Sequence, residues 1–521
     1  MTADAVIVGS GINALVAGAL LARKGWGVTV CERSDYAGGA ICTRTDLFDG
    51  YTVELLSSWH PLFMGGPAYA ELASDLAARG LEYRNTTTPT GVVCADGAMT
   101  LSTDPAATTE SMAAVGDADA WNAMLAGFGA KADLAFGVLG LDFWRRSAWK
   151  FGWKAYRQLG RQGLAASGAE LLEPAGPWLD RTFRSPVTRA LLGPWALHNG
   201  LGPEDSGSAF ITQVIGAAIA WGGMPVPVGG GVRLVEALTG IITSAGGQVL
   251  LGSEVTRIEV SGGRATGVQL SDGTVIAARR AVLASVTPQA LYCGLLADAP
   301  VDPARRQAAQ AYRYGRAGMQ IHLALSEQPD WVEASMKDVA IVHVLDSMDS
   351  LTESVSAAGR GLLPRRPTIV VGQPTTVDAS RAPAGKGLLW IQLQENPRNP
   401  RGDLAGEISV SDSGWTTAMR DAYADRVIAQ LEPHIRNIRS AQTARHVLGP
   451  ADLQALNVNL VGGDPYAGDC RLDQYALWRP LSTATGHSTG ITGLWQIGAS
   501  THPGPGLGGG SGYQVASRLL S

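Results

Sequence analysis

Two glycine-rich segments, one near each end of the chain, restrict most strongly what this chain can fold into. Residues 4–18 read DAVIVGSGINALVAG, and residues 494–516 read LWQIGASTHPGPGLGGGSGYQVA. In each segment a short apolar run typical of a buried strand is followed by glycines and then by a helical pattern. We therefore expect a strand, a tight turn and a helix at both ends of the chain.

The N-terminal turn has the spacing of a dinucleotide-binding motif. Glycines at positions 9 and 11 allow the backbone to approach a pyrophosphate, which binds at the positive N-terminal end of the following helix. A second strand ends at Glu32, where an acid accepts hydrogen bonds from ribose hydroxyls. This combination predicts an adenine dinucleotide. Its predicted binding residues here are Gly9, Gly11, Asn13, Ala14 and Glu32.

Two further features favour FAD over NAD. Six residues after Glu32 comes the pair Gly38-Gly39, which lets the chain fold back beside the phosphates of a flavin dinucleotide. The second strand-turn-helix unit, at the C-terminus, suggests one extended cofactor that both ends of the chain contact. These features add Arg33, Gly38, Gly39, Gly498, Ala499, Gly506, Leu507 and Gly508 to the predicted cofactor site.

The sequence resembles the phytoene desaturase-like flavin-dependent oxidoreductases, which include carotenoid desaturases, isomerases and ketolases and several uncharacterised relatives. The resemblance covers most of the chain and lies in residues 9–18, 32–39, 225–238, 254–288, 462–481 and 498–516. It implies an FAD whose adenine lies near Val255. Many flavoproteins of this superfamily carry Gly-Asp where this chain has Gly498-Ala499, so backbone amides of the terminal helix would have to bind more of the flavin. No cysteine lies near these glycines, so we expect non-covalent FAD.

The order of the patterns predicts an α/β fold with a discontinuous Rossmann-like FAD-binding domain and an inserted mixed α+β substrate domain. We assign residues 1–70, 225–300 and 482–521 to the first domain, and 71–224 and 301–481 to the second. The region from about 70 to 220 has a helical pattern. Expected hairpins turn at Gly262-Gly263 and Asp272-Gly273. Further expected strands are 282–284, 320–325, 369–371 and 388–393, and further expected helices are 233–244 and 416–431.

Composition limits the classes of function. The 521 residues suffice for two domains with full cores, and the net charge of −5 gives no electrostatic basis for binding nucleic acid. Charged residues make up only 17%, below the usual quarter or so, which points to a large apolar interior, an apolar ligand cavity or a lipid-facing or partner-facing surface. The five cysteines are scattered, without metal-ligand spacing, so we expect reduced thiols in a cytoplasmic protein without a metal site.

Two histidines are candidate catalytic residues. His60 lies just after the first dinucleotide-binding half, where members of the resembled family line the flavin, and a structural role has equal weight. His502 lies in the terminal glycine-rich loop, where shaping the loop by a hydrogen bond to the backbone is the alternative. His198 either lines the substrate cavity or is a satisfied core histidine. Hydrolase and phosphoryl-transfer motifs are absent from the sequence.

Residues 143–161, FWRRSAWKFGWKAYRQLGR, combine aromatic and basic residues at helical spacing. Such a helix can lie in a membrane interface, which would make the protein peripheral to a membrane. The alternative, which we favour at this point, is a helix whose tryptophans belong to the core and whose cations are solvated.

The sequence therefore predicts an FAD-dependent oxidoreductase that dehydrogenates an apolar substrate, such as a polyene or a terpenoid, by hydride transfer to flavin N5. Three alternatives remain open: a flavin amine oxidase, a redox-neutral flavin isomerase, and a non-catalytic protein that retains FAD. The substrate, the electron acceptor and the oligomeric state do not follow from the sequence.

Overall fold

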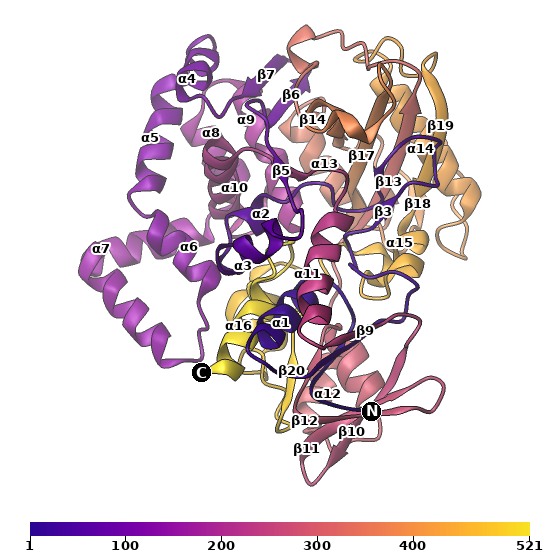
Figure 1. The fold of residues 1–521 in the computed structure, drawn as a ribbon. Coiled ribbons are helices and arrows are strands. Elements are labelled where there is room, and N and C mark those ends of the chain that lie inside the picture. The colour runs from indigo at the N-terminus through magenta and orange to yellow at the C-terminus, as the bar shows by residue number, and fades with distance from the viewer.

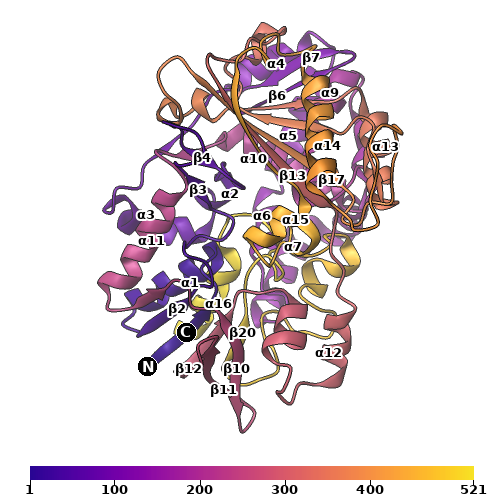
Figure 2. The ribbon, with the colours of Figure 1, turned by 90° about the vertical axis from the view of Figure 1, so that its right-hand side faces the viewer.

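The computed structural model describes residues 1–521, apart from the side chain of Leu139. Within these residues the chain forms two seven-stranded sheets, which lie at the lower and upper parts of the molecule in Figure 2. Helices from the first third of the chain flank the upper sheet and also project sideways from the body (Figure 1). The predicted α/β fold class is confirmed. The domain boundaries 1–70, 225–300 and 482–521 remain a prediction.

The first sheet brings together strands from both ends and the middle of the chain. Its order is β10-β11-β12-β1-β2-β9, with β20 paired to β12. Strands β1, β2, β9, β12 and β20 run parallel, whereas β10, β11 and β12 form the two predicted hairpins. Its strands are β1 (Thr2–Val8), β2 (Val28–Cys31), β9 (Gln248–Leu250), β10 (Val255–Ser261), β11 (Arg264–Leu270), β12 (Val275–Ala284) and β20 (Leu494–Gln496).

Helix α1 (Ile12–Arg23) is the central helix on this sheet. All of its residues except Arg23 are buried, because it packs against α11 (Val232–Ser244) and α16 (Gly510–Leu520). Gly18 permits the close approach, since a Cβ at this position would lie 2.9 Å from Cδ1 of Ile242 on α11. Segments from residues 12, 232 and 510 therefore form one helical layer (Figure 1).

The second sheet has the order β19-β13-β17-β16-β14-β6-β7. One of its faces packs its apolar side chains against α14 (Thr417–Leu431), in a core that includes Ile321, Ile391 and Ile428. Its strands are β6 (Thr90–Cys94), β7 (Gly97–Leu101), β13 (Ala317–Leu325), β14 (Ile341–Val344), β16 (Ile369–Gly372), β17 (Gly387–Asn396) and β19 (Gln442–Leu448). The expected strands 320–325, 369–371 and 388–393 and the helix 416–431 are confirmed, the last as α14 (Thr417–Leu431) with Thr416 as its N-cap.

The expectation that residues 70–220 are helical is wrong for residues 83–101, which contain three strands. Strands β6 and β7 form an antiparallel hairpin that extends the second sheet through β14. The turn residues Asp96-Gly97 between two apolar runs were the local signal for it. The helices of this region are α3 (Pro67–Ala77), α4 (Pro105–Ala113), α5 (Ala118–Gly129), α6 (Ala132–Gly140), α7 (Arg146–Leu172), α8 (Ala175–Thr182), α9 (Pro186–Leu192) and α10 (Ser208–Gly222).

Short elements connect these layers. The remaining strands are β3 (Thr43–Arg44), β4 (Val53–Glu54), β5 (Tyr83–Arg84), β8 (Val226–Pro227), β15 (Leu362–Leu363) and β18 (Gly402–Asp403). The remaining helices are α2 (Pro61–Met64), α12 (Pro303–Gln310), α13 (Met348–Gly359) and α15 (Pro450–Leu456), with a 3-10 helix at Gly193–Asn199. No helix of the described residues is long and apolar enough to cross a membrane.

The favoured burial of the tryptophans in residues 143–161 is wrong. The side chains of Trp144, Trp149 and Trp153 are 51%, 84% and 63% exposed. They lie on or just before α7, which projects from the body at the left of Figure 1 and has few neighbours to cover it. Within residues 70–220 the buried tryptophans are Trp121, Trp178 and Trp195, which belong to the core on one side of the second sheet.

Candidate functional site: a dinucleotide cradle

The two glycine-rich turns start side by side, at the carboxyl ends of three neighbouring parallel strands. Strand β12 lies between β1 and β20. Just beyond its end, two backbone hydrogen bonds continue its pairing with both neighbours. Ser285 donates its N–H to the carbonyl of Val8 at 3.0 Å, and Ile497 donates to the carbonyl of Ala284 at 2.9 Å. The fold therefore places the N-terminal and C-terminal turns at one edge of the sheet.

Ser285 lies between the two turns and is close to both. A Cβ at Gly9 would lie 3.5 Å from the carbonyl oxygen of Ser285, and a Cβ at Gly498 would lie 3.1 Å from its Oγ. Both glycines also have positive φ angles, 86° and 104°, which other residues rarely adopt. The structure thus brings together the two predicted halves of the cofactor site.

The N-terminus of α1 is open for an anion. Its N-cap is Gly11, no side chain of the described residues caps it, and its first turn contains no acid. A Cβ at Gly11 would meet no described atom within 4 Å, so there is free space beside the start of the helix, where the first N–H groups have no partner within the helix. An uncapped helix N-terminus with such a surface fits a pyrophosphate. Asn13 and Ala14, predicted cofactor residues, lie in this first turn and are buried.

The Gly38-Gly39 pair closes one side of this cradle. Gly38 donates its N–H to the carbonyl of Ser10 at 3.2 Å, and a bridge pairs it with Gly11. A Cβ at Gly39 would lie 3.0 Å from Cα of Gly11. The chain therefore folds back against the glycine turn at Gly38 and Gly39. This is the arrangement expected if the backbone of both segments contacts the phosphates.

Glu32 is buried at the end of β2 and holds the glycine turn. Its Oε2 atom accepts hydrogen bonds from N and Oγ of Ser10 at 2.9 and 2.6 Å, and its Oε1 accepts from N of Ser34 at 2.9 Å. Because each carboxylate oxygen has two lone pairs, ribose hydroxyls can still donate to it. Ser10 was not among the predicted residues, and its position between the two glycines was the only local signal for it.

The adenine end of the predicted site is more exposed. The guanidinium of Arg33 lies 3.7 Å from the carboxylate of Glu254, and both side chains are about half exposed. Val255, at the start of β10, is buried with Val8 and Cys31 at the ends of β1 and β2. Val255, which is expected near the adenine, therefore borders the carboxyl edge of the sheet.

The C-terminal turn is held by polar side chains that the sequence analysis did not single out. The N–H of Gly498 donates to Oγ of Ser511 at 3.0 Å, and Oγ of Ser511 lies 2.7 Å from Oγ1 of Thr501. The buried guanidinium of Arg479 donates from Nε to the carbonyl of Ala499 at 3.0 Å. Ala499 is thus positioned through its backbone, and no acid follows Gly498 in this turn.

The loop that contains Gly506, Leu507 and Gly508 packs under α2. A Cβ at Gly506 would lie 2.6 Å from Cδ1 of Leu62, and one at Gly508 would lie 3.4 Å from the carbonyl oxygen of Leu62. Helix α2 follows His60 directly. Helix α2, which follows His60, therefore covers the loop that begins at His502.

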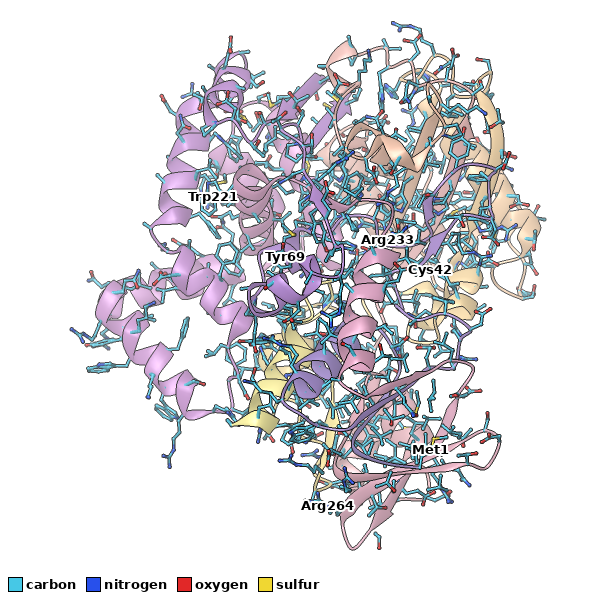
Figure 3. All side chains as sticks on the ribbon, viewed as in Figure 1. Met1, Cys42, Tyr69, Trp221, Arg233 and Arg264 are labelled. Atoms are coloured by element: carbon cyan, nitrogen blue, oxygen red, sulfur yellow. The ribbon has the colours of Figure 1, made fainter. Side chains whose placement is uncertain are left out.

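His60 is fully buried and neutral. Its Nδ1 lies 3.0 Å from Oη of Tyr83, and Tyr83 also packs edge-on against Tyr69 of α3, which is labelled in Figure 3. Burial, with a smaller contribution from the positive charge of Arg381, lowers the pKa of His60 to about 3. Its Nε2 has no hydrogen-bond partner among the described residues. The Nε2 atom of His60 can therefore make one more hydrogen bond while the ring stays neutral.

His502 is also buried, and it lies at the start of the terminal loop. Its ring packs edge-on against the ring of Phe143, with 5.0 Å between the ring centroids. His198 lies elsewhere, in the 3-10 helix beside the second sheet, where its Nε2 is 3.0 Å from Nε2 of His343. Burial lowers the pKa of His198 to about 3 and also lowers that of His343 well below its ordinary value, so both rings are neutral. One of the two Nε2 atoms then donates a hydrogen bond to the other.

A buried ionic cluster joins the segments around the cradle, and the sequence did not reveal it. Arg381 donates to Oε1 of Glu54 at 3.0 Å and to Oδ2 of Asp378 at 2.9 Å, and all three side chains are at most 1% exposed. Oε1 of Glu54 also accepts from N of Gly231, at the start of α11, at 2.7 Å. Burial raises the pKa of Glu54 while Arg381 opposes the shift. Arg381 and Glu54 are 327 positions apart, so local patterns could not pair them.

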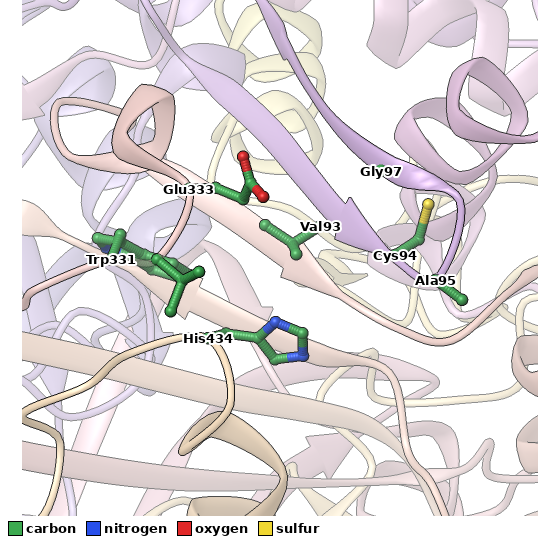
Figure 4. A pocket seen from close by; sticks show the side chains of 8 residues that line it. Val93, Cys94, Ala95, Gly97, Trp331, Glu333 and His434 are labelled. Carbon is green, nitrogen blue, oxygen red and sulfur yellow. The ribbon is translucent and has the colours of Figure 1, made fainter.

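A separate small hollow of about 220 Å³ lies away from the cradle (Figure 4). Trp331, Glu333 and His434 line it together with Cys94 at the end of β6, and none of the glycine turns contributes to it. No group of three His, Cys, Asp or Glu side chains among the described residues is placed to hold a metal ion. The cradle at the sheet edge is therefore the candidate functional site.

The uncapped α1, the paired glycine turns and the acid at the end of β2 fit an extended dinucleotide, which defines a dinucleotide-binding protein with a Rossmann-like sheet. Comparison with family models gives the same class. Residues 15–393 match the model of the flavin-containing amine oxidoreductases, so the chain belongs to this family. It is a flavin-dependent oxidoreductase.

The similarity to two relatives covers different shares of this chain. The lycopene-forming phytoene desaturase of Paracoccus sp. is 30% identical over 60% of this chain and 60% of its own length. One component of the limonene dehydrogenase of Castellaniella defragrans is 24% identical over 99% of this chain and 94% of its own length. The resemblance to phytoene desaturase-like proteins is confirmed.

Solved structures share the fold at low sequence identity. Cyclohexylamine oxidase from Brevibacterium oxydans superposes with a TM-score of 0.58 at 16% identity, and the match covers 99% of this chain and 98% of that chain. At this identity the likeness shows the architecture alone.

Proposed function

We propose that the protein is an FAD-dependent dehydrogenase that introduces a double bond into an apolar substrate, such as a polyene or a terpenoid. The observation that carries this proposal is the meeting of the Gly9 and Gly498 turns at Ser285, which supports a cofactor long enough to contact both ends of the chain. The apolar substrate class is supported by the names of two relatives, a phytoene desaturase and a component of a limonene dehydrogenase.

The residues of the chain have separate roles in this proposal. The backbone N–H groups at the start of α1 bind the pyrophosphate, and Glu32 accepts hydrogen bonds from the adenosine ribose. The turn from Gly498 to Gly508 lies along the flavin end. When bound, the flavin supplies the acceptor for the hydride that leaves the substrate. His60 is a neutral hydrogen-bonding group, so it adds no buried charge beside an apolar substrate.

The test is anaerobic reduction of the purified yellow protein. A suitable polyene or terpenoid should bleach the absorbance of the oxidised flavin, whereas NADPH alone should bleach it slowly, because the sequence contains one complete dinucleotide fingerprint. Acid precipitation should release intact FAD into the supernatant, as expected for a non-covalent cofactor. Protein that neither carries nor takes up FAD would refute the proposal, and rapid stoichiometric reduction by NADPH would refute the dehydrogenase assignment.

A flavin amine oxidase is the second candidate, since the family model that matches residues 15–393 is that of the flavin-containing amine oxidoreductases. Bleaching by cyclohexylamine or another amine, with no response to hydrocarbons, would establish this alternative. Conversion of a polyene only by the reduced protein, without net consumption of an acceptor, would identify an isomerase. Bound FAD that no substrate of either class reduces would indicate a non-catalytic protein.

A further inference from the structure

We propose that the arm formed by α6 and α7 docks on a lipid surface that carries negative charge. Helix α7 is kinked at Gly160, where the backbone is not helical, and it stands away from the body at the left of Figure 1. Of its described residues only Ala155 is buried. A helix with so little contact to its own protein needs another surface to cover its apolar residues.

An aromatic stripe lies on the exposed side of this helix. Trp149, Trp153 and Tyr156 have the spacing i, i+4 and i+7, which places them on one face. Their side chains are 84%, 63% and 47% exposed, and the rings of Trp153 and Tyr156 stack with 5.7 Å between centroids. Ala155 lies on the opposite side of the helix. Soluble proteins rarely leave a continuous aromatic surface of this kind to water.

A basic stripe runs beside the aromatic one. Arg146, Lys150 and Arg157 follow it at spacings of four and seven residues, and all three side chains are exposed without an ion pair among the described residues. The sequence contains no acidic residue from position 143 to 169, although the whole chain has a net charge of −5. The positive charge is therefore local to this arm.

The acids nearest to the arm are already paired. Asp133 pairs with Lys154 at 2.5 Å, and Asp142 lies 3.8 Å from Arg145. Glu170 pairs with Lys131 of the neighbouring loop at 2.8 Å. These pairs leave the cations of the basic stripe to an external partner.

The chemistry of the two stripes favours lipid over a second copy of the chain. Tryptophan and tyrosine beside lysine and arginine is the composition of a helix that lies in a membrane interface, with its cations at anionic headgroups. A two-fold contact through the same face would bring two positive stripes together, which costs free energy. The surface is therefore complementary to negative headgroups and not to itself.

The base of the arm lies against the candidate site. Gln514 of α16 donates from Nε2 to the carbonyl of Gly140 at 3.1 Å, and Phe143 packs on His502 of the terminal loop. A docked arm would hold this side of the site close to the lipid. If the proposed function holds, an apolar substrate dissolved in the lipid would reach the site from here, but docking itself needs neither substrate nor turnover.

The test is co-sedimentation of the FAD-loaded protein with phosphatidylcholine vesicles that do or do not contain phosphatidylglycerol. We expect sedimentation with the anionic vesicles at low salt, and less as salt rises, because headgroup attraction is screened. The variant Arg146→Gln/Lys150→Gln/Arg157→Gln should lower the partition coefficient roughly 100-fold. The matched control Lys337→Gln/Arg360→Gln/Arg365→Gln removes the same charge from exposed positions elsewhere and should bind like the wild type.

A second pair of variants tests the aromatic stripe. Trp149→Ser/Trp153→Ser should also lose binding, whereas Trp221→Ser, which removes a half-exposed tryptophan outside the arm, should keep it. All variants should retain the wild-type flavin spectrum and melting temperature. Failure of the wild type to sediment with anionic vesicles would overturn the proposal, as would equal loss in the matched controls. A wild-type dimer in solution that dissociates in the tryptophan variant, without vesicle binding, would assign the face to a second copy instead.

Discussion

The side-chain oxygen of Asn13 accepts a hydrogen bond from the backbone N–H of Gly512 at 3.2 Å, although 499 positions separate the two residues. This bond joins the first turn of α1 to the first turn of α16. A Cβ at residue 512 would lie 1.8 Å from the carbonyl oxygen of Asn13, so only glycine allows this approach. The two helices that begin at the cradle are therefore packed as one unit.

We predict that Gly512→Ala damages both stability and cofactor binding. The added methyl group forces α16 away from α1, which should lower the free energy of unfolding by about 1–3 kcal/mol and reduce the flavin content of the purified protein. Denaturant unfolding and the flavin-to-protein absorbance ratio measure the two effects. The control is Gly168→Ala in α7, where a Cβ meets no described atom within 4 Å and should cost nothing. Equal behaviour of the two variants would show that the helix contact is not tight.

Replacement of Glu32 should weaken FAD binding. The carboxylate accepts hydrogen bonds from Ser10, and we expect it to accept from the ribose, so Glu32→Gln should cost about 1–3 kcal/mol of binding free energy. Fluorescence titration of the apoprotein with FAD should show the dissociation constant rising roughly 5- to 150-fold. The matched variant Glu236→Gln, at an exposed position of α11, should bind as the wild type does. An unchanged constant in Glu32→Gln would exclude a ribose contact.

The stability of the protein should fall at acidic pH because of its buried histidines. Burial, together with His446, lowers the pKa of His322 to about 3, whereas an unfolded histidine has a pKa of about 6.5. Between these values only the unfolded chain binds the proton, so this stabilisation is complete above about pH 6.5 and is lost as the pH falls, with a slope of about 1.4 kcal/mol per pH unit.

The comparison of the wild type with His322→Gln isolates this effect. Burial raises the pKa values of Glu54, Glu395 and Asp464, and these acids act in the opposite direction, so the absolute pH profile combines several groups. The difference in unfolding free energy between wild type and variant should shrink from pH 7 to pH 5. A difference that stays constant over this range would show that the pKa of His322 is not lowered in the folded protein.

The buried ionic cluster should respond strongly to loss of its cation. Arg381→Leu leaves the carboxylate of Glu54 buried without a counter-charge, and leaves Asp378 with only Arg84, 4.0 Å away, so we expect a loss of about 3–5 kcal/mol in unfolding free energy. The deficit should be smaller at lower pH, because protonation of Glu54 removes one unpaired charge. Arg189→Leu, which breaks an exposed pair with Asp180, should cost at most about 1 kcal/mol. Similar losses in both variants at neutral pH would contradict this account.

Local sequence patterns were sufficient to predict the elements of the cradle. Glycine spacing after an apolar strand, and an acid at the end of the next strand, report backbone conformation and strand ends that neighbouring residues determine. The same holds for the two hairpins and for α14, because turn residues and apolar periodicity are properties of short segments. The hairpin of β6 and β7 was missed only because its Asp96-Gly97 turn lies within a region dominated by helical patterns.

The sequence by itself determined the class of this protein: two dinucleotide-type turns, an α/β architecture and a flavin-dependent oxidoreductase. The tertiary structure decided which residues complete the site and which surface the chain leaves open. The contact of Asn13 with Gly512 and the cluster around Arg381 join residues hundreds of positions apart, and no periodicity encodes such pairs. The exposure of Trp149 and Trp153 likewise depends on what packs against α7, since helical spacing defines a face but not what covers it.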